Sequence, residues 1–88
     1  MQVTKHLVLR GRNLGGYVRD SLAAEAFALG ISGWTRVRPD GNVEAMVSAD
    51  DEMISTLIDW ATRAPGVQAV DIGDGEGSFS NFETRTDA

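Results

Sequence analysis

The sequence predicts an α+β domain in the order β-α-β-β-α-β, followed by one extra strand. Two segments repeat apolar residues every three or four positions, as helices with one buried face do. Between them lie segments in which apolar and polar residues alternate, which is typical of strands with one buried face. Glycine and proline turn signals separate these segments. The order predicts the split β-α-β, or ferredoxin-like, arrangement, with an antiparallel sheet and two helices on one face.

The first half of the chain contains a strand, a helix and a hairpin. The first predicted strand, Val3–Arg10, alternates Leu7 and Leu9 with polar neighbours. The helix is predicted to start at Arg19 or Asp20 and to end at Leu29, because the glycines of segment 11–16 favour a loop. Gly30 suits the position after a helix end. The hairpin has predicted strands at 32–38 and 43–48 around a Pro-Asp-Gly turn.

The second half contains the more regular helix. It is predicted to start at Asp50 or Asp51, where acidic residues favour a helix N-terminus, and to end at the Pro65-Gly66 pair. Strands are predicted at 67–72 and 78–84, and residues 87–88 are expected to fray. With 88 residues and 42% apolar composition, the chain is expected to form one domain, residues 1–88.

Composition and charge limit the classes of function. There is no cysteine, which excludes disulfides and thiolate metal sites. No run approaches a signal peptide or the roughly 20 apolar residues of a membrane span, so we expect a cytoplasmic protein that does not bind membranes. Residues 1–38 carry six basic and two acidic residues, whereas residues 39–88 carry two basic and eleven acidic ones. The acidic half argues against nucleic-acid binding, but a small anion could bind the basic half.

The segment Gly11–Arg19, read GRNLGGYVR, is the strongest candidate for a site. Glycine lets backbone amides approach a ligand closely, a helix N-terminus offers unpaired N–H groups, and a guanidinium can donate two parallel hydrogen bonds to an oxyanion. The glycine spacing matches neither common nucleotide-binding fingerprint. The chain has a single histidine, His6, and no metal-binding cluster, so we expect neither a metal nor a cofactor.

In its context the segment resembles the loop of the acylphosphatases. Their pattern is a strand, Gly-Arg-Val-Gln-Gly-Val-Gly-Phe-Arg, a helix ending near Leu-Gly, a strand beginning Gly-Trp-Val-Arg-Asn, and an Asp-Gly-x-Val-Glu hairpin. The matching residues are Gly11-Arg12, Gly15, Arg19, Ala28-Leu29-Gly30, Gly33-Trp34, Arg36 and Asp40-Gly41-Asn42-Val43-Glu44. The resemblance covers nearly the whole chain, since Trp60, Pro65 and Ser80-Asn81-Phe82 also suit the family.

The resemblance implies hydrolysis of the carboxyl–phosphate bond of small acyl phosphates, giving a carboxylate and phosphate without a metal or a covalent intermediate. In the family the loop amides and the arginine hold the phosphate, and an asparagine at the end of the second strand positions the attacking water. Arg19 falls on the family arginine. The implied substrate-binding residues are Asn13, Leu14, Gly15, Gly16, Tyr17, Val18 and Arg19.

Two departures from the family pattern concern catalysis. Val37 stands at the position of the water-positioning asparagine, and valine has no side-chain donor or acceptor that could orient a water. Losing such a contact costs on the order of a hundredfold in rate. In the loop, Gly16 and Tyr17 replace the family's Val-Gly order. A tyrosine forced to positive φ would cost about 1 kcal/mol or more, so the cradle could have another shape.

Three hypotheses for the function follow. The first is a working acylphosphatase, for which the polar candidates to replace the asparagine are Asn13, Thr35 and Arg36. The second is a catalytically silent module that binds a small anion or a protein partner. The third, an RNA-binding domain, is disfavoured because Trp34 is the one aromatic residue that could stack a base on the sheet. We expect a monomer with a small anionic ligand such as an acyl phosphate, phosphate or sulfate.

Overall fold

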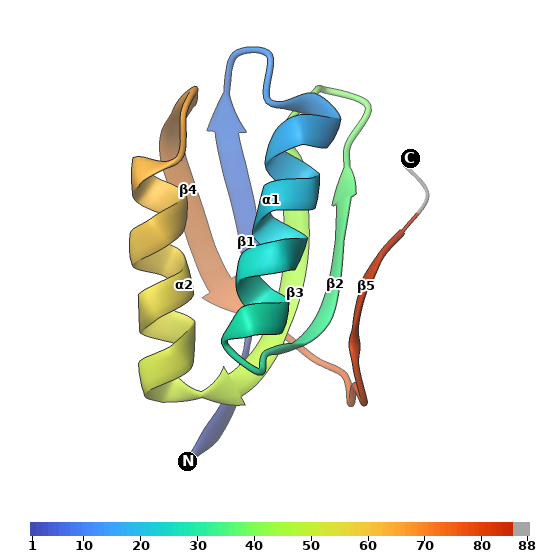
Figure 1. Cartoon of the computed structure of the whole chain (residues 1–88), viewed down its shortest axis with the longest axis vertical. Coiled ribbons are helices and arrows are strands. Elements are labelled where there is room, and N and C mark those ends of the chain that lie inside the picture. Colours follow the sequence, from blue (N-terminus) through green and yellow to red (C-terminus); the bar gives the residue numbers. More distant parts are fainter. Residues whose placement is uncertain (86–88) are drawn as a thin grey trace.

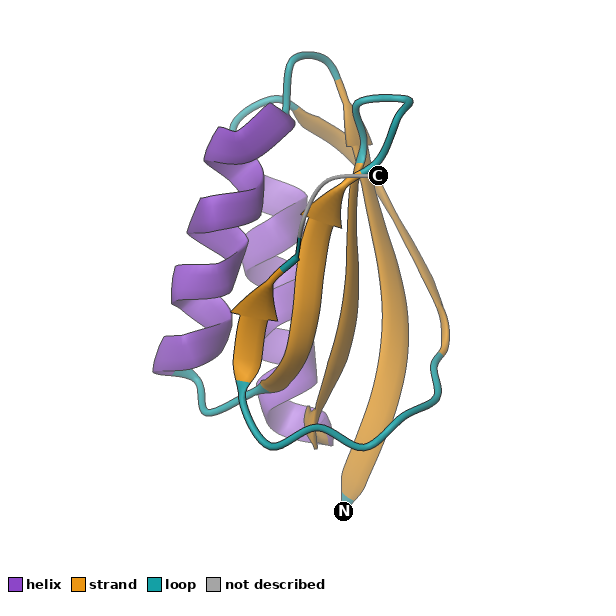
Figure 2. Ribbon diagram, turned by 90° about the vertical axis from the view of Figure 1, so that its right-hand side faces the viewer, coloured by secondary structure: helices purple, strands orange, loops and turns teal. Residues whose placement is uncertain are grey.

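A computed structural model, which describes residues 1–85, shows a five-stranded sheet covered on one face by two helices (Figures 1 and 2). The elements follow the predicted order and are listed here with their bounds: β1 (Gln2–Gly11), α1 (Gly15–Ala28), β2 (Ser32–Val37), β3 (Val43–Asp50), α2 (Asp51–Arg63), β4 (Val67–Asp74) and β5 (Phe82–Thr84). The ferredoxin-like α+β prediction is confirmed. The predicted fraying of residues 87–88 lies outside the described residues.

The strand order in the sheet is β4-β1-β3-β2-β5. Four strands are antiparallel neighbours, but β5 pairs with β2 in parallel, so the sheet is mixed and the prediction of an antiparallel sheet is wrong for its last strand. The reason is the connection after β4, which crosses below the open sheet face to the far edge before β5 begins (Figure 2). It passes so close that a Cβ on Gly75 would lie 2.4 Å from the sulfur of Met46. Residues 78–81 belong to this crossing and not to the predicted strand.

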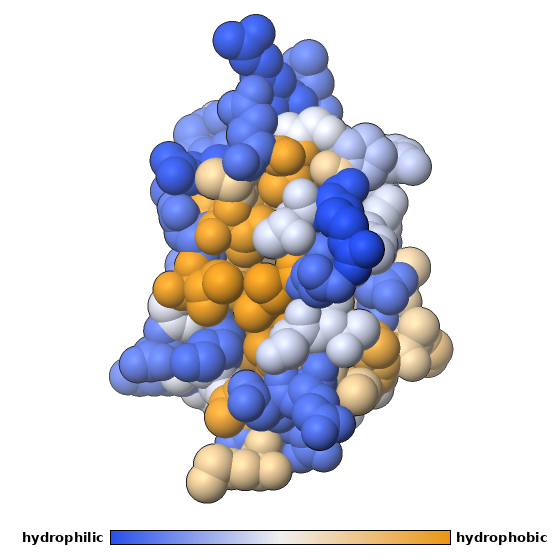
Figure 3. Space-filling view, turned by 90° about the vertical axis from the view of Figure 1, so that its left-hand side faces the viewer, coloured by the Kyte–Doolittle hydropathy of each residue, from blue (hydrophilic) through white to orange (hydrophobic). Residues whose placement is uncertain are grey.

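The core lies between the helices and the sheet. It is formed by the inward faces of β1, β3, α1 and α2 and includes fully buried side chains: Leu7, Leu9, Leu22, Ala26, Val43, Ala45, Val47, Leu57 and Ala61. Where α2 and β4 meet, a band of hydrophobic side chains reaches the surface between polar ones (Figure 3). Ile72, in the edge strand β4, is 53% exposed there.

α1 ends at Ala28, one residue before the predicted Leu29, and Gly30 follows the C-cap as predicted. Gly30 has φ +71, and its N–H donates to Phe27 O, while Ile31 N–H donates to Ala26 O. These two bonds form a Schellman motif, in which carbonyl groups at the helix end that lack a partner within the helix accept hydrogen bonds. The buried Ile31 side chain then turns the chain into β2. The same geometry makes α1 pack directly on β2, which holds the two parts of the candidate site together.

Candidate anion-binding site

The turn between β1 and α1 is built from two left-handed residues. Asn13 has φ +56 and Gly15 has φ +51; asparagine and glycine are the residues that adopt this conformation at least cost. At the base of the turn, the backbone of Gly11 touches that of Gly66, since a Cβ on Gly11 would lie 2.0 Å from the Gly66 carbonyl oxygen. This contact fixes the loop against the turn that follows α2.

The helix begins four residues before the predicted start, at Gly15, with Leu14 as its N-cap. The first bond of the helix runs from Val18 N–H to Leu14 O at 3.3 Å. The N–H groups of Gly15, Gly16 and Tyr17 precede it, so they have no partner within the helix. The low helix propensity of glycine led to the wrong start. The segment is therefore a first helical turn and not an open loop.

Arg19 consequently lies in the second turn of α1, not at the helix start. Side chains of a helix lean toward its N-terminus, and the Arg19 side chain lies against the turn before it. A Cβ built on Gly16 would be 3.1 Å from Arg19 Nη2, so the guanidinium lies directly over the bare backbone of Gly16. Asp20 accepts a hydrogen bond from Arg19 Nε at 3.1 Å. The guanidinium is thus next to the free amides of the first turn.

The other predicted loop residues fall into two groups. Leu14 and Val18 are 2% and 3% exposed, so their side chains belong to the core and only their backbone could face a ligand. Asn13 is exposed, and Tyr17 is 70% exposed. Asn13 is the one non-glycine residue with positive φ in residues 1–85. The strain considered for Tyr17 is therefore absent, and Gly16 and Tyr17 both lie in the first turn of α1 without positive φ.

Val37 ends β2 at the same end of the molecule as the start of α1 (Figure 1). It is partly buried and packs against the core. Of the nearby polar candidates, Thr35 is fully buried and its hydroxyl donates to Glu44 O at 3.0 Å. Arg36 lies on the opposite face of β2, where its Nε donates to Glu44 Oε1 at 2.8 Å. Thr35 and Arg36 therefore cannot replace an asparagine at Val37.

The open face of the sheet carries a separate cluster of charged and aromatic residues. His6 Nε2 donates to Glu44 Oε2 at 2.6 Å, beside the bond from Arg36. Burial raises the pKa of the Glu44 carboxyl, but these two hydrogen bonds and the charges of His6 and Arg36 outweigh burial and hold the pKa below its usual value. The guanidinium groups of Arg36 and Arg85 lie 5.5 and 4.7 Å from the Trp34 ring. Trp34 is 9% exposed, so most of its surface is packed against neighbouring groups.

Within residues 1–85, no group of three or more His, Cys, Asp or Glu side chains could hold a metal ion. No helix in the same range is long and apolar enough to cross a membrane.

Comparison with known proteins identifies the relatives of this chain. The sequence pattern of the acylphosphatase family matches residues 5–84. The chain belongs to the acylphosphatase family. It is 45% identical over 87 residues to an acylphosphatase of Thiobacillus denitrificans, covering 96% of this chain and 98% of that protein. It is 40% identical over 86 residues to an acylphosphatase of Albidiferax ferrireducens, covering 94% of both.

Solved structures of acylphosphatases share the fold. The acylphosphatase of Coxiella burnetii superposes with a TM-score of 0.88 at 24% identity, over 96% of this chain and 93% of that one. The acylphosphatase of Bacillus subtilis gives a TM-score of 0.85 at 19% identity, over 97% and 99%. The resemblance inferred from the sequence is confirmed. The assignment of individual site residues stays a prediction, and sequence reasoning missed the contacts of Arg19 with Gly16 and Asp20.

Proposed function

We propose that this protein binds the phosphoryl group of small acyl phosphates at the first turn of α1 and hydrolyses the carboxyl–phosphate bond at a reduced rate. The observation that carries the proposal is the Arg19 guanidinium, which lies over Gly16 beside the free amides of the turn. Membership of the acylphosphatase family supports the reaction class. The ligand is a small anion, and we expect the protein to act as a cytoplasmic monomer without nucleic acid, membrane or cofactor.

The proposed reaction needs positioning and charge stabilisation. A water molecule attacks phosphorus, the bond between phosphorus and the acyl oxygen breaks, and the carboxylate leaves with the electron pair. The protons of the water pass to the phosphate product and to solvent. Charge on the phosphoryl oxygens is stabilised by the backbone amides of Gly15, Gly16 and Tyr17 and by Arg19. A carboxylate is a good leaving group, so neither a metal nor a protein nucleophile is needed.

The site departs from the family pattern where the attacking water should be positioned. The side chain of Val37 cannot hydrogen-bond a water, and the hydrogen bonds that Thr35 and Arg36 make to Glu44 exclude these two residues as substitutes. Asn13 is exposed in the turn and is the remaining candidate from the sequence. We expect a rate on the order of a hundredfold below that of a site with the asparagine. A silent module that binds the anion without hydrolysis is the second candidate, and Val37 is the observation that favours it.

The proposal is tested by hydrolysis of acetyl phosphate and by titration with inorganic phosphate. We expect slow turnover by the wild type and faster turnover by Val37→Asn. Val37→Ala is the matched control, because it removes the same methyl groups without adding an amide. Arg19→Ala is expected to abolish both turnover and phosphate binding.

Asn13→Gly tests the remaining substitute, because glycine tolerates the φ of +56 and only the side-chain amide is lost. A further drop in turnover would assign the water to Asn13. If the wild type and Val37→Asn are both inert while phosphate binds, the silent module is correct. If phosphate shifts no amide signals of the first turn of α1, both candidates are wrong.

A further inference from the structure

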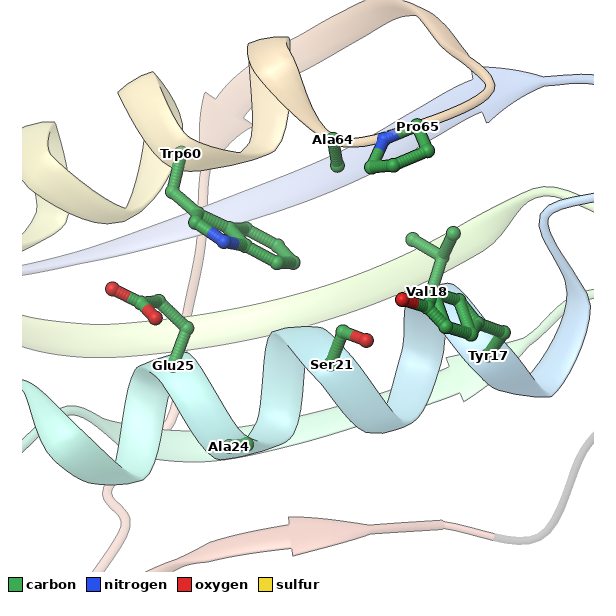
Figure 4. A pocket seen from close by; sticks show the side chains of 8 residues that line it. All are labelled: Tyr17, Val18, Ser21, Ala24, Glu25, Trp60, Ala64 and Pro65. Carbon is green, nitrogen blue, oxygen red and sulfur yellow. The ribbon is translucent and has the colours of Figure 1, made fainter.

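A groove of about 390 Å³ runs between α1 and α2 (Figure 4). Its walls include Tyr17, Val18 and Ser21 from α1 and Trp60 from α2, and Pro65 lies at the end near the β1–α1 turn. The Trp60 ring extends from α2 across the groove toward α1. Trp60 is only partly buried, so this aromatic surface is available to a ligand.

The groove adjoins the first turn of α1, where the phosphate site is proposed, at Tyr17 and Val18. Tyr17 and Val18 belong to both: their backbone lies in the first turn of α1, while their side chains line the groove. The contact between Gly11 and Gly66 holds the turn after α2 against the base of the β1–α1 turn. It thereby places Pro65, next to Gly66, at the groove end beside the phosphate site. A ligand with its phosphoryl group at the amides could therefore extend its other end into the groove.

The lining selects the chemistry of that other end. Trp60 and Pro65 offer aromatic and apolar surface, which favours aromatic or branched groups. Glu25 is the one charged residue in the lining. Its carboxylate would repel a second carboxylate on a ligand. A two-carbon acetyl group is too short to reach far into a space of this volume, whereas a phenyl group extends further into it and contacts more of its lining.

We propose that the groove between α1 and α2 is the acyl subsite of this protein and selects uncharged aromatic or branched acyl phosphates over acetyl phosphate and over acyl groups that carry a carboxylate. This inference rests on the proposed function, since the phosphate site orients the ligand. The groove sets affinity and substrate choice, whereas Arg19 and the amides hold the phosphoryl group.

Stable analogues test the subsite without hydrolysis. (2-Oxopropyl)phosphonate stands in for acetyl phosphate, and (2-oxo-3-phenylpropyl)phosphonate for phenylacetyl phosphate, because a methylene replaces the labile oxygen in each. By calorimetry we expect the phenyl compound to bind about tenfold more tightly, as expected for burying a ring of that size. Its binding should shift the indole N–H signal of Trp60, and the oxopropyl compound should leave that signal unchanged.

Two variants alter the groove from opposite sides. Trp60→Leu removes the aromatic wall, and Ser21→Leu fills the space from α1; each should cut the preference for the phenyl compound to about twofold. Phe27→Leu is the matched control, because Phe27 is an aromatic residue of α1 that is 78% exposed and lies outside the groove. It should leave the preference unchanged, and circular dichroism checks that all three variants fold.

The outcomes separate this inference from the proposed function. If inorganic phosphate and both phosphonates bind the wild type equally well, the acyl subsite is wrong and the phosphate site stands. The same conclusion follows if the preference persists in both groove variants. If neither phosphonate nor phosphate binds, the proposed function itself is wrong and the subsite falls with it.

Discussion

Replacing Gly16 by alanine should make the protein more stable and weaken its phosphate binding. Gly16 lies in the first turn of α1 and has no positive φ, so alanine fits the backbone. Alanine in place of a helical glycine stabilises by about 0.5–1 kcal/mol. The new methyl group, however, would lie 3.1 Å from Arg19 Nη2, roughly half an ångström inside an ordinary contact. The guanidinium must therefore move away from the amides.

The size of the effect follows from the bond that is disturbed. A hydrogen bond to a charged group contributes about 1.5–3 kcal/mol. A shift of a few tenths of an ångström should forfeit roughly 1 kcal/mol of this, which weakens phosphate binding about fivefold. The assays are urea unfolding for stability and calorimetric titration with phosphate. Gly15→Ala gives the contrast in stability: it meets no atom, but its φ of +51 should destabilise the fold by about 1 kcal/mol.

A double-mutant cycle tests whether the effect acts through the guanidinium. In an Arg19→Ala background, Gly16→Ala should no longer change phosphate binding, because the displaced group is absent. If Gly16→Ala weakens binding equally in both backgrounds, or does not weaken it in the wild type, the position of Arg19 over Gly16 is not what organises the site.

Three further predictions concern the sheet and the core. Gly33→Ala should destabilise the fold by at least about 3 kcal/mol in urea unfolding, because its φ is +139 and its Cβ would lie 1.8 Å from Met46 O; Gly41→Ala, with φ +86 but open space, should cost only about 1 kcal/mol. The lowered pKa of Glu44 implies stability that is present above the unfolded pKa, near pH 4, and is lost as pH falls through the folded pKa. Glu44→Gln should therefore lose less stability than the wild type between pH 5 and 3. If the difference in stability between the two proteins stays the same over this pH range, the prediction is wrong. Leu57→Ala, at a fully buried position in α2, should cost about 2–5 kcal/mol in thermal or urea unfolding, and a smaller loss would mean that the core collapses around the gap.

The sequence was sufficient for the order of elements and for most of the core. Alternation in β1 and β3 and the regular apolar stripe of α2 reflect burial on one face, which local patterns record directly. The direction of β5 was not predictable in this way. The seven residues between β4 and β5 can reach either edge of the sheet, and the choice depends on contacts such as that of Gly75 with Met46.

The candidate site was predictable in identity but not in geometry. The order of glycines and the arginine identified the segment, and the family resemblance gave its role. The helix start at Gly15 was missed because glycine has a low helix propensity. In this structure the first residue of α1 has a positive φ, and glycine adopts that conformation at little cost. The position of Arg19 over Gly16 and the groove beside Trp60 depend on side-chain packing between elements, which no local pattern contains.

The place of β1 in the sheet has a consequence for how the chain is made. β1, the first of these strands in the chain, becomes an interior strand between β3 and β4, with Gln2 opposite Asp50 and Lys5 opposite Asp74. Its neighbour β3 is translated only near the middle of the chain, and its other neighbour, β4, later still. Strands that are far apart in the sequence pair slowly, because the long segment between them must close into a loop before their contacts can form. Until then β1 has two unpaired edges, so we expect the nascent chain to depend on chaperones before the β4 segment is translated.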